Sequence, residues 1–275
     1  MYAGKPENVQ PPKPVTVSKL LRMKQEGEKI ACLTAYDFSF ASAFDEAAVD
    51  VILVGDSLGN VVQGLETTLP VTVDEMIYHT RCVARGRRRA LLMADLPFMS
   101  YATVDEALRN AGRLMKEGGA HMVKLEGSGD QAEIVARLSQ AGIPVCAHLG
   151  LQPQLVHKVG GYKVQGKDPE AAEVMLKDAV LLQDAGADVL LLECVPAELG
   201  KRISGELRIP VIGIGGGPGC DGQILVMHDM LGITPGKRPK FSEDFMQGRD
   251  SIREAVRAYV EAVKAGDFPS LSHSF

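Results

Sequence analysis

The sequence predicts an α/β fold, a (β/α)8 TIM barrel of parallel strands. Its 275 residues suit an α/β barrel, which commonly runs to about 200–250 residues as one domain. Short apolar runs alternate with longer amphipathic stretches, as in buried parallel strands separated by helices. The first strand–helix turn, Tyr36–Ser39, contains no glycine, whereas the competing open doubly wound sheet usually has a glycine-rich first turn.

Eight apolar runs have the length of buried strands. In chain order they are Ile30–Thr34, Val51–Val54, Leu91–Ala94, His121–Leu125, Pro144–Ala147, Val189–Leu192, Val211–Ile214 and Ile224–Met227. A proline opens the fifth run and directly precedes the seventh. Proline is tolerated at the start of a strand because its missing N–H lies outside the ladder.

Helical patterns separate these runs. They include Val73–Arg85, Val104–Lys116, Gln131–Gln140, Ala171–Ala185 and a final Ser251–Ala265. Segments ending at Asp56, Gly127 and Cys194 each run from small residues through an apolar strand to an acid, which indicates repeated strand–helix units. No change in composition marks a second domain, so we expect a Pro-rich arm over residues 1–17 and a single barrel over residues 18–275.

Composition and charge exclude several classes of protein. The formal net charge of −5 argues against a nucleic-acid binder, and we interpret the basic run Arg85–Arg89 as a solvated helix end. No apolar run approaches the length of a membrane span, and the N-terminus lacks the apolar core of a secretory signal. Five scattered cysteines without a CxxC pair fit a reducing compartment. We therefore expect a cytoplasmic protein without a nucleic-acid or membrane partner.

Polar residues follow the middle strands. Asp56, Asp95, Glu126 and Glu193 each come at or just after the end of a predicted strand, and His148 ends the strand between the last two. The carboxyl ends of barrel strands converge on one face, where catalytic groups lie. Carboxylates gathered there raise one another's pKa, and a hard cation such as Mg²⁺ relieves the repulsion. The alternative is that each acid caps the following helix.

We interpret Asp56 and Asp95 as Mg²⁺ ligands, with Glu126 at or beside the metal. Lys124 lies two residues before Glu126 and therefore on the same face of its strand, where an ammonium suits a substrate carboxylate. A Lys124–Glu126 pair without a substrate role is the alternative. The hydroxyl and backbone N–H of Ser57 could hold a carboxylate or keto oxygen, or Ser57 is a simple turn residue.

The glycine-rich segment Gly213–Gly222 lacks the Lys-Ser/Thr of a phosphate-binding P-loop and the acid of a dinucleotide fingerprint. We expect it to form a tight loop that closes over the substrate after the seventh strand. Phosphate binding by this loop stays an open alternative.

A series of motifs resembles the ketopantoate hydroxymethyltransferase family. In order they are VGDSLG, TLPVTVDEMIYH, ADLPFMSY, VKLEG, AHLGLQPQ, GGYKVQGKD, LLLECVP and PVIGIGGG. Their shared order extends from about Ser18 to the last helix. The resemblance implies a barrel of the phosphoenolpyruvate/pyruvate type, one Mg²⁺ per subunit, and a homo-oligomer such as a decamer.

The resemblance also implies the reaction. A hydroxymethyl group passes from 5,10-methylenetetrahydrofolate to 3-methyl-2-oxobutanoate through a Mg²⁺-stabilised enolate. The products are 2-dehydropantoate and tetrahydrofolate, in the first step of pantothenate biosynthesis. By resemblance Asp56, Asp95 and Glu126 hold the metal, and Glu193 is the catalytic base. The residues implied to contact the keto acid are Asp56, Ser57, Asp95 and Lys124, and His148 is a candidate for supporting the metal ligands.

Two alternatives remain. One is a related Mg²⁺-dependent barrel lyase or mutase that acts on a 2-oxo acid. Isocitrate-lyase-like enzymes carry a catalytic cysteine in a Lys-Lys-Cys-Gly-His loop that this sequence lacks, and we expect Cys194 to point away from the site because it follows Glu193 on a strand. The other is an inactive barrel that serves as a binding module.

Overall fold

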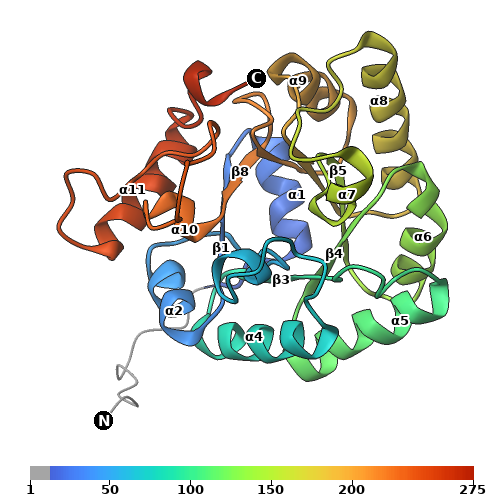
Figure 1. Cartoon of the computed structure of the whole chain (residues 1–275), viewed down its shortest axis with the longest axis horizontal. Coiled ribbons are helices and arrows are strands. Elements are labelled where there is room, and N and C mark those ends of the chain that lie inside the picture. The colour runs from blue at the N-terminus through green and yellow to red at the C-terminus, as the bar shows by residue number, and fades with distance from the viewer. Residues whose placement is uncertain (1–12) are drawn as a thin grey trace.

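The computed structural model describes residues 13–275, and its strands close into a parallel barrel (Figure 1). The strands are β1 (Ile30–Thr34), β2 (Val51–Val54), β3 (Leu91–Asp95), β4 (Met122–Glu126), β5 (Val145–Gly150), β6 (Val189–Glu193), β7 (Val211–Ile214) and β8 (Gly222–Leu225). Each pairs with the next in sequence, and β8 pairs with β1. The predicted (β/α)8 barrel is confirmed.

Helices surround this ring (Figure 1). The longer ones outside the barrel are α2 (Phe38–Glu46), α4 (Val73–Gly86), α5 (Val104–Arg113), α6 (Ala132–Gln140), α8 (Pro169–Asp184), α9 (Ala197–Glu206) and α11 (Ile252–Ala265). Short helices α3 (Leu58–Val61), α7 (Val156–Val159) and α10 (Met227–Met230) lie in loops. Polar caps set several starts: Thr72 and Glu75 form a capping box on α4, and Ser251 caps α11. Within residues 13–275, no helix is long and apolar enough to cross a bilayer.

The core has two layers because strand side chains alternate between the faces of the barrel wall. Outward-facing side chains pack against the surrounding helices. Inward-facing ones, such as Val51 and Met122, fill the barrel interior together with Leu20 and Met23 of helix α1 (Val17–Glu26). Helix α1, which crosses the ring in Figure 1, therefore closes the end of the barrel opposite the carboxyl ends of the strands.

The structure describes only the last residues of the predicted arm. Residues 1–12 of the expected 1–17 segment lie outside the described residues. Beyond them, the backbone N–H of Val15 donates to the carbonyl of Arg89. Helix α1 begins at Val17 because the Thr16 side chain caps it by accepting from the N–H of Lys19.

Several element boundaries differ from prediction; β5, for example, runs over Val145–Gly150 and not Pro144–Ala147. The last strand runs over Gly222–Leu225 and not Ile224–Met227. It starts at a glycine because a Cβ on Gly222 would lie 2.5 Å from the carbonyl oxygen of Ile30, its partner in β1. The helix predicted to reach Lys116 ends at Arg113 and continues as a π-turn.

A buried carboxylate joins three elements at the closed end of the barrel. Asp50, just before β2, has no exposed surface. Its oxygens lie 2.6 Å from Arg89 Nη2 and 2.6 Å from Lys264 Nζ at the end of α11. The N–H of Ala31 in β1 also donates to it, at 3.1 Å. Two cations and a backbone donor thus replace the water that the carboxylate loses on folding.

Replacing Asp50 with alanine is expected to lower the free energy of unfolding by about 3–5 kcal/mol, because buried charges lose their partner. Chemical denaturation followed by circular dichroism measures the change. Glu173→Gln, in the exposed ion pair with Arg202, is the matched control and should leave the transition nearly unmoved. An Asp50→Ala protein as stable as the wild type would show that this cluster does not hold the barrel end together.

Candidate active site

The inward-facing side chains change from apolar to polar as the strands approach their carboxyl ends. Above the apolar interior lie Asp95 in β3, Lys124 and Glu126 in β4, His148 in β5 and Glu193 in β6. The register sets Asp95 beside Lys124 and Glu126 beside His148. Strand alternation alone therefore brings five polar side chains to one mouth of the barrel.

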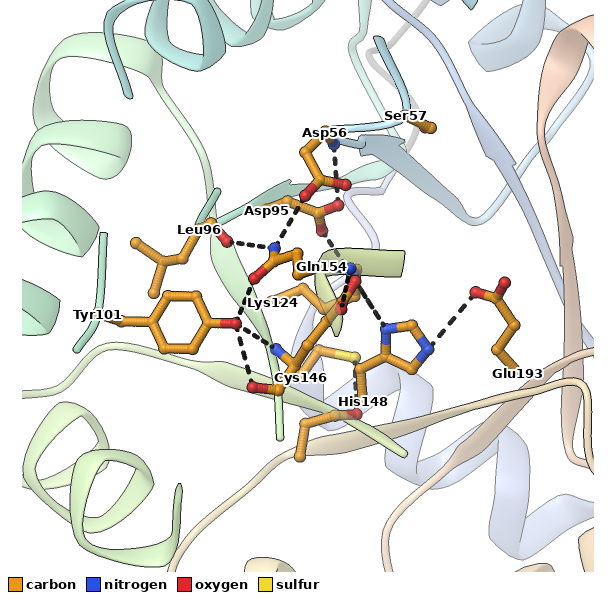
Figure 2. Close-up of polar contacts among 12 residues, drawn as sticks. Asp56, Ser57, Asp95, Leu96, Tyr101, Lys124, Cys146, His148, Gln154 and Glu193 are labelled. Carbon is orange, nitrogen blue, oxygen red and sulfur yellow. Dashed lines mark hydrogen bonds and ion pairs between the residues drawn. The ribbon is translucent and has the colours of Figure 1, made fainter. Parts of the chain in front are cut away.

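The structure brings all the candidate site residues into one cavity of about 120 Å³ at this mouth (Figure 2). They are Asp56, Ser57, Asp95, Lys124, Glu126, His148 and Glu193. Their placement is what the strand-end argument requires, and their chemical roles remain predictions.

A tight turn after β2 carries Asp56 and Ser57 into the cavity. A Cβ on Gly55 would lie 2.7 Å from Ser57 Oγ, so a glycine is needed where the chain turns. The backbone N–H of Asp56 donates to Asp95 Oδ2 at 3.0 Å. That hydrogen bond ties the turn to the end of β3 and sets the two aspartates next to each other.

Lys124 is a buried cation among these acids, with only 4% of its surface exposed. Its Nζ lies 3.0 Å from Asp95 Oδ1 and 4.0 Å from Glu126 Oε1. Burial by itself lowers the pKa of Lys124, but the negative charges of Asp95, Glu126 and Asp56 outweigh it and raise the pKa above its ordinary value. The ammonium therefore stays charged at neutral pH.

His148 stands between Glu126 and Glu193. Its Nδ1 lies 3.3 Å from Lys124 Nζ, and its Nε2 lies 3.5 Å from Glu193 Oε2 (Figure 2). Burial and the charge of Lys124 lower the pKa of His148, so the imidazole is neutral. Nδ1 also lies 3.6 Å from Glu126 Oε1, so the ring stands between the Lys124 ammonium and the two glutamates.

The environment moves the pKa values of the two glutamates apart. Burial raises the pKa of Glu126, but His148, Lys124 and a hydrogen bond from the Gln154 N–H together bring it below its ordinary value. For Glu193, burial and then the charge of Glu126 raise the pKa to about 8. A carboxyl that titrates near neutral pH is suited to act as a general base.

Asp56 and Asp95 carry more negative charge than their surroundings offset. Burial raises the pKa of both carboxyls, and the charges of Asp95 and Glu126 raise that of Asp56 further. Asp95 Oδ1 is buried and meets Lys124 without a well-aligned hydrogen bond. Adjacent carboxylates of this kind fit a hard divalent cation, since Mg²⁺ usually takes one or two carboxylates and completes its shell with water or substrate oxygens.

Few side chains at the site are placed to bind a metal ion. Across residues 13–275, no group of three or more His, Cys, Asp or Glu side chains is arranged to hold a metal. Glu126 Oε2 accepts from the Gln154 N–H at 3.0 Å, and its Oε1 lies 3.6 Å from His148 Nδ1. The role of Glu126 as a metal ligand thus stays a prediction, and the two aspartates are the better-placed pair.

A larger cavity of about 610 Å³ opens onto the same residues. It shares Asp56, Ser57 and Glu193 with the smaller cavity. Its other walls include Tyr162, Lys163, Lys240 and Phe275, and Phe241 lines both cavities. Sequence reasoning did not locate this cavity. The only signal was the GGYKVQGKD motif, which contains the first two of these residues.

Two expectations near β6 and β7 are corrected. Of the glycine-rich segment Gly213–Gly222, which was expected to close over the substrate, only Ile214 lines either cavity. The segment packs on α9, where a Cβ on Gly217 would lie 2.6 Å from the Cβ of Ala197. Cys194 does not point away from the site but lines the larger cavity. Strand alternation does not apply to it, because β6 ends at Glu193 and Cys194 has a positive φ of 48°.

Sequence reasoning also missed two residues that touch the site. Tyr36 opens the first strand–helix turn, and its hydroxyl lies 2.8 Å from Ser57 Oγ. Gln154 bonds to Asp56 and Glu126. It lies in the AHLGLQPQ motif, but a glutamine carries no charge to mark it.

Comparison with known proteins decides the family. The sequence profile of a family described as ketopantoate hydroxymethyltransferase matches residues 14–271. The chain belongs to the ketopantoate hydroxymethyltransferase family. The 3-methyl-2-oxobutanoate hydroxymethyltransferase of Alkalilimnicola ehrlichii is 66% identical to it, over 100% of this chain and 99% of that protein. The enzyme of the same name from Halorhodospira halophila is 61% identical, over 95% and 94%. The family resemblance is confirmed, and the chain is an enzyme of the transferase class.

Solved structures share the fold of this family member. A phosphoenolpyruvate phosphomutase from Streptomyces platensis subsp. rosaceus matches with a TM-score of 0.60 at 14% identity, over 78% of this chain and 82% of that one. A 2,3-dimethylmalate lyase of the PEP mutase/isocitrate lyase superfamily matches with a TM-score of 0.60 at 16% identity, over 92% and 95%. At these identities the likeness shows the fold alone, a barrel shared with both proteins.

The carboxyl of Glu193 is expected to titrate with a midpoint of about 8. It should be protonated and neutral below this pH and ionised above it, because burial disfavours the charge. Carbon-13 NMR of the protein labelled at glutamate carboxyls, without divalent cation, measures the midpoint, and Glu193→Gln identifies the resonance. A midpoint near the ordinary 4.5 would contradict the burial argument.

Proposed function

We propose that the chain transfers a hydroxymethyl group from 5,10-methylenetetrahydrofolate to 3-methyl-2-oxobutanoate, giving 2-dehydropantoate and tetrahydrofolate. The observation that carries the proposal is the presence of Glu193, with its raised pKa, and the ammonium of Lys124 in one small cavity. A 2-oxo acid needs a cation for its carboxylate and a base for the carbon beside its ketone. The names of the 66% and 61% identical relatives support the same substrate.

Binding of the keto acid follows from groups already held in position. Lys124 attracts the substrate carboxylate while Asp95, 3.0 Å away, keeps the ammonium in place. Ser57 offers a hydroxyl and a backbone N–H to a substrate oxygen, and the contact with Tyr36 orients that hydroxyl. A substrate fixed in this way loses its freedom before the chemical step, which lowers the barrier.

Asp56 and Asp95 would hold one Mg²⁺, with Glu126 at or beside it, and this ion when bound supplies Lewis-acid polarisation of the keto oxygen. Glu193 in its ionised form takes the proton from the carbon next to the ketone. The neutral imidazole of His148, whose Nε2 lies 3.5 Å from Glu193 Oε2, packs beside that carboxylate. The electron pair of the broken C–H bond forms the new C–C bond to the one-carbon unit. The two C–N bonds that held this carbon break, and water supplies the oxygen of the new hydroxyl. Tetrahydrofolate leaves with the proton taken by Glu193 on one nitrogen and a proton from the water on the other.

The larger cavity is the proposed place of the one-carbon donor. It reaches Glu193 and Asp56, so a donor bound there would present its carbon to the substrate in the smaller cavity. Tyr162 and Phe241 offer aromatic faces to a pterin ring, and Lys163 and Lys240 suit its acidic tail.

Several finer features stay predictions. The decameric assembly rests on the family resemblance. The cytoplasmic location and the division into an arm over residues 1–17 and a barrel over residues 18–275 rest on composition. The alternative activity, a lyase or mutase reaction on a 2-oxo acid, would use the same cation and base but no one-carbon donor.

Exchange of the C3 proton of 3-methyl-2-oxobutanoate, followed by NMR in D₂O, tests the proposal. With Mg²⁺, the wild-type protein should exchange this proton, and Glu193→Gln should slow exchange by about 10²–10⁴-fold because the base is lost. Glu198→Gln, at an exposed position on α9, is the matched control and should exchange at the wild-type rate. Adding 5,10-methylenetetrahydrofolate should then yield 2-dehydropantoate. Exchange that survives in Glu193→Gln would refute the base, and the absence of product would favour the lyase or mutase.

A further inference from the structure

Gln154 occupies a junction among the acids of the site. It comes from the short 3-10 turn Pro153–Leu155 that follows β5, and only 4% of its surface is exposed. Its side chain reaches across the mouth toward the ends of β2 and β3 (Figure 2). Nothing in the proposed chemistry assigns it a role.

Both ends of the Gln154 side-chain amide and its backbone N–H have a partner. Its Nε2 donates to Asp56 Oδ2 at 2.8 Å and to the carbonyl of Leu96 at 3.0 Å. Its Oε1 accepts from the hydroxyl of Tyr101 at 2.5 Å. Its backbone N–H donates to Glu126 Oε2 at 3.0 Å. One residue therefore binds two of the acids predicted at the metal, through two separate groups.

The orientation of the amide follows from the chemistry of its partners. A carboxylate and a carbonyl oxygen only accept hydrogen bonds, so the NH₂ group must face Asp56 and Leu96. The amide oxygen then faces Tyr101, whose hydroxyl can donate. If the amide were flipped, its oxygen would meet two acceptors in a buried place, which is costly.

We propose that Gln154 is a positioning residue for the divalent-cation site, an inference that rests on the proposed function. Its amide occupies one oxygen of Asp56 and leaves the other free for the cation. Its backbone N–H holds Glu126 back from the two aspartates. Residues that hydrogen-bond metal ligands fix the orientation of those ligands, and their loss typically costs 10–100-fold in metal affinity.

Gln154→Met separates the two contacts. Methionine has a similar length and keeps the backbone N–H to Glu126, but it cannot donate to Asp56. The matched control is Gln152→Met, two residues away, because the Gln152 amide donates only to the carbonyl of Gly127. Mn²⁺ serves as the probe, and the electron paramagnetic resonance of the free ion measures its binding, with and without 3-methyl-2-oxobutanoate. We expect about 10–100-fold weaker binding by Gln154→Met and wild-type binding by Gln152→Met.

Tyr101→Phe gives a second measurement that a merely structural role would not produce. It removes the donor that orients the amide, so Mn²⁺ binding should weaken in the same direction. The Tyr101 hydroxyl also contacts the backbone of Glu126, at 3.3 Å from its N and 3.1 Å from its O. If its effect runs through the Gln154 contact to Asp56, the double variant should bind Mn²⁺ no more weakly than Gln154→Met alone, and a further loss would overturn that shared route. If Gln154→Met fails to fold, Tyr101→Phe decides, and wild-type binding by that variant would overturn the proposal.

The outcomes distinguish this proposal from the one it rests on. A wild-type protein that binds no Mn²⁺, with or without the keto acid, would refute the cation site itself. Binding by the wild type that is unchanged in folded Gln154→Met would leave the cation site standing and overturn only the role of Gln154. An equal loss in Gln152→Met would overturn it as well, since the effect would then come from disturbing the loop.

Discussion

The mouth of the barrel depends on the buried ammonium of Lys124. It stands within 4.0 Å of both Asp95 and Glu126, and their charges keep it protonated in spite of burial. One cation does not offset all the acids that line the cavity, and burial together with the neighbouring acids raises the pKa of Asp56, Asp95 and Glu193. The proposed cation site and the proposed base therefore both depend on burial combined with a shortage of positive charge.

His148 lies between Glu126 and Glu193, two glutamates that differ in their protonation. As a neutral ring it lies between the glutamates without adding charge, with Nδ1 3.6 Å from Glu126 Oε1 and Nε2 3.5 Å from Glu193 Oε2. Glu126 gains Lys124 and the Gln154 N–H as partners and is ionised, while Glu193 has no ammonium beside it. Two carboxyls of the same type therefore receive different protonation states from their surroundings, which is how acid and base roles are separated in enzymes.

How far the sequence could predict the site depends on which element carries each residue. Asp95, Lys124 and Glu126 were predictable because strand alternation fixes the face of each side chain. Gln154 and Tyr36 lie in loops, where no period sets direction, and their value comes from partners far away in sequence. The start of β8 at Gly222 was missed for a similar reason: it depends on close contact with Ile30 and not on hydrophobicity. The alternation of side chains between the two faces could not place Cys194, because β6 ends one residue earlier, at Glu193.

Buried acids at the two ends of the barrel differ in how much positive charge lies beside them. At the closed end, Asp50 meets two cations and a backbone N–H, an arrangement that satisfies its charge and can only hold elements together. At the open end, Asp56 is fully buried beside Asp95 and meets the Gln154 amide but no cation of its own. A buried acid without a nearby positive charge lowers the stability of the folded protein. Binding of a positively charged ligand restores that stability. Residues at the amino ends of the strands therefore stabilise the fold, and residues at the carboxyl ends carry the chemistry. Barrel enzymes generally show this division.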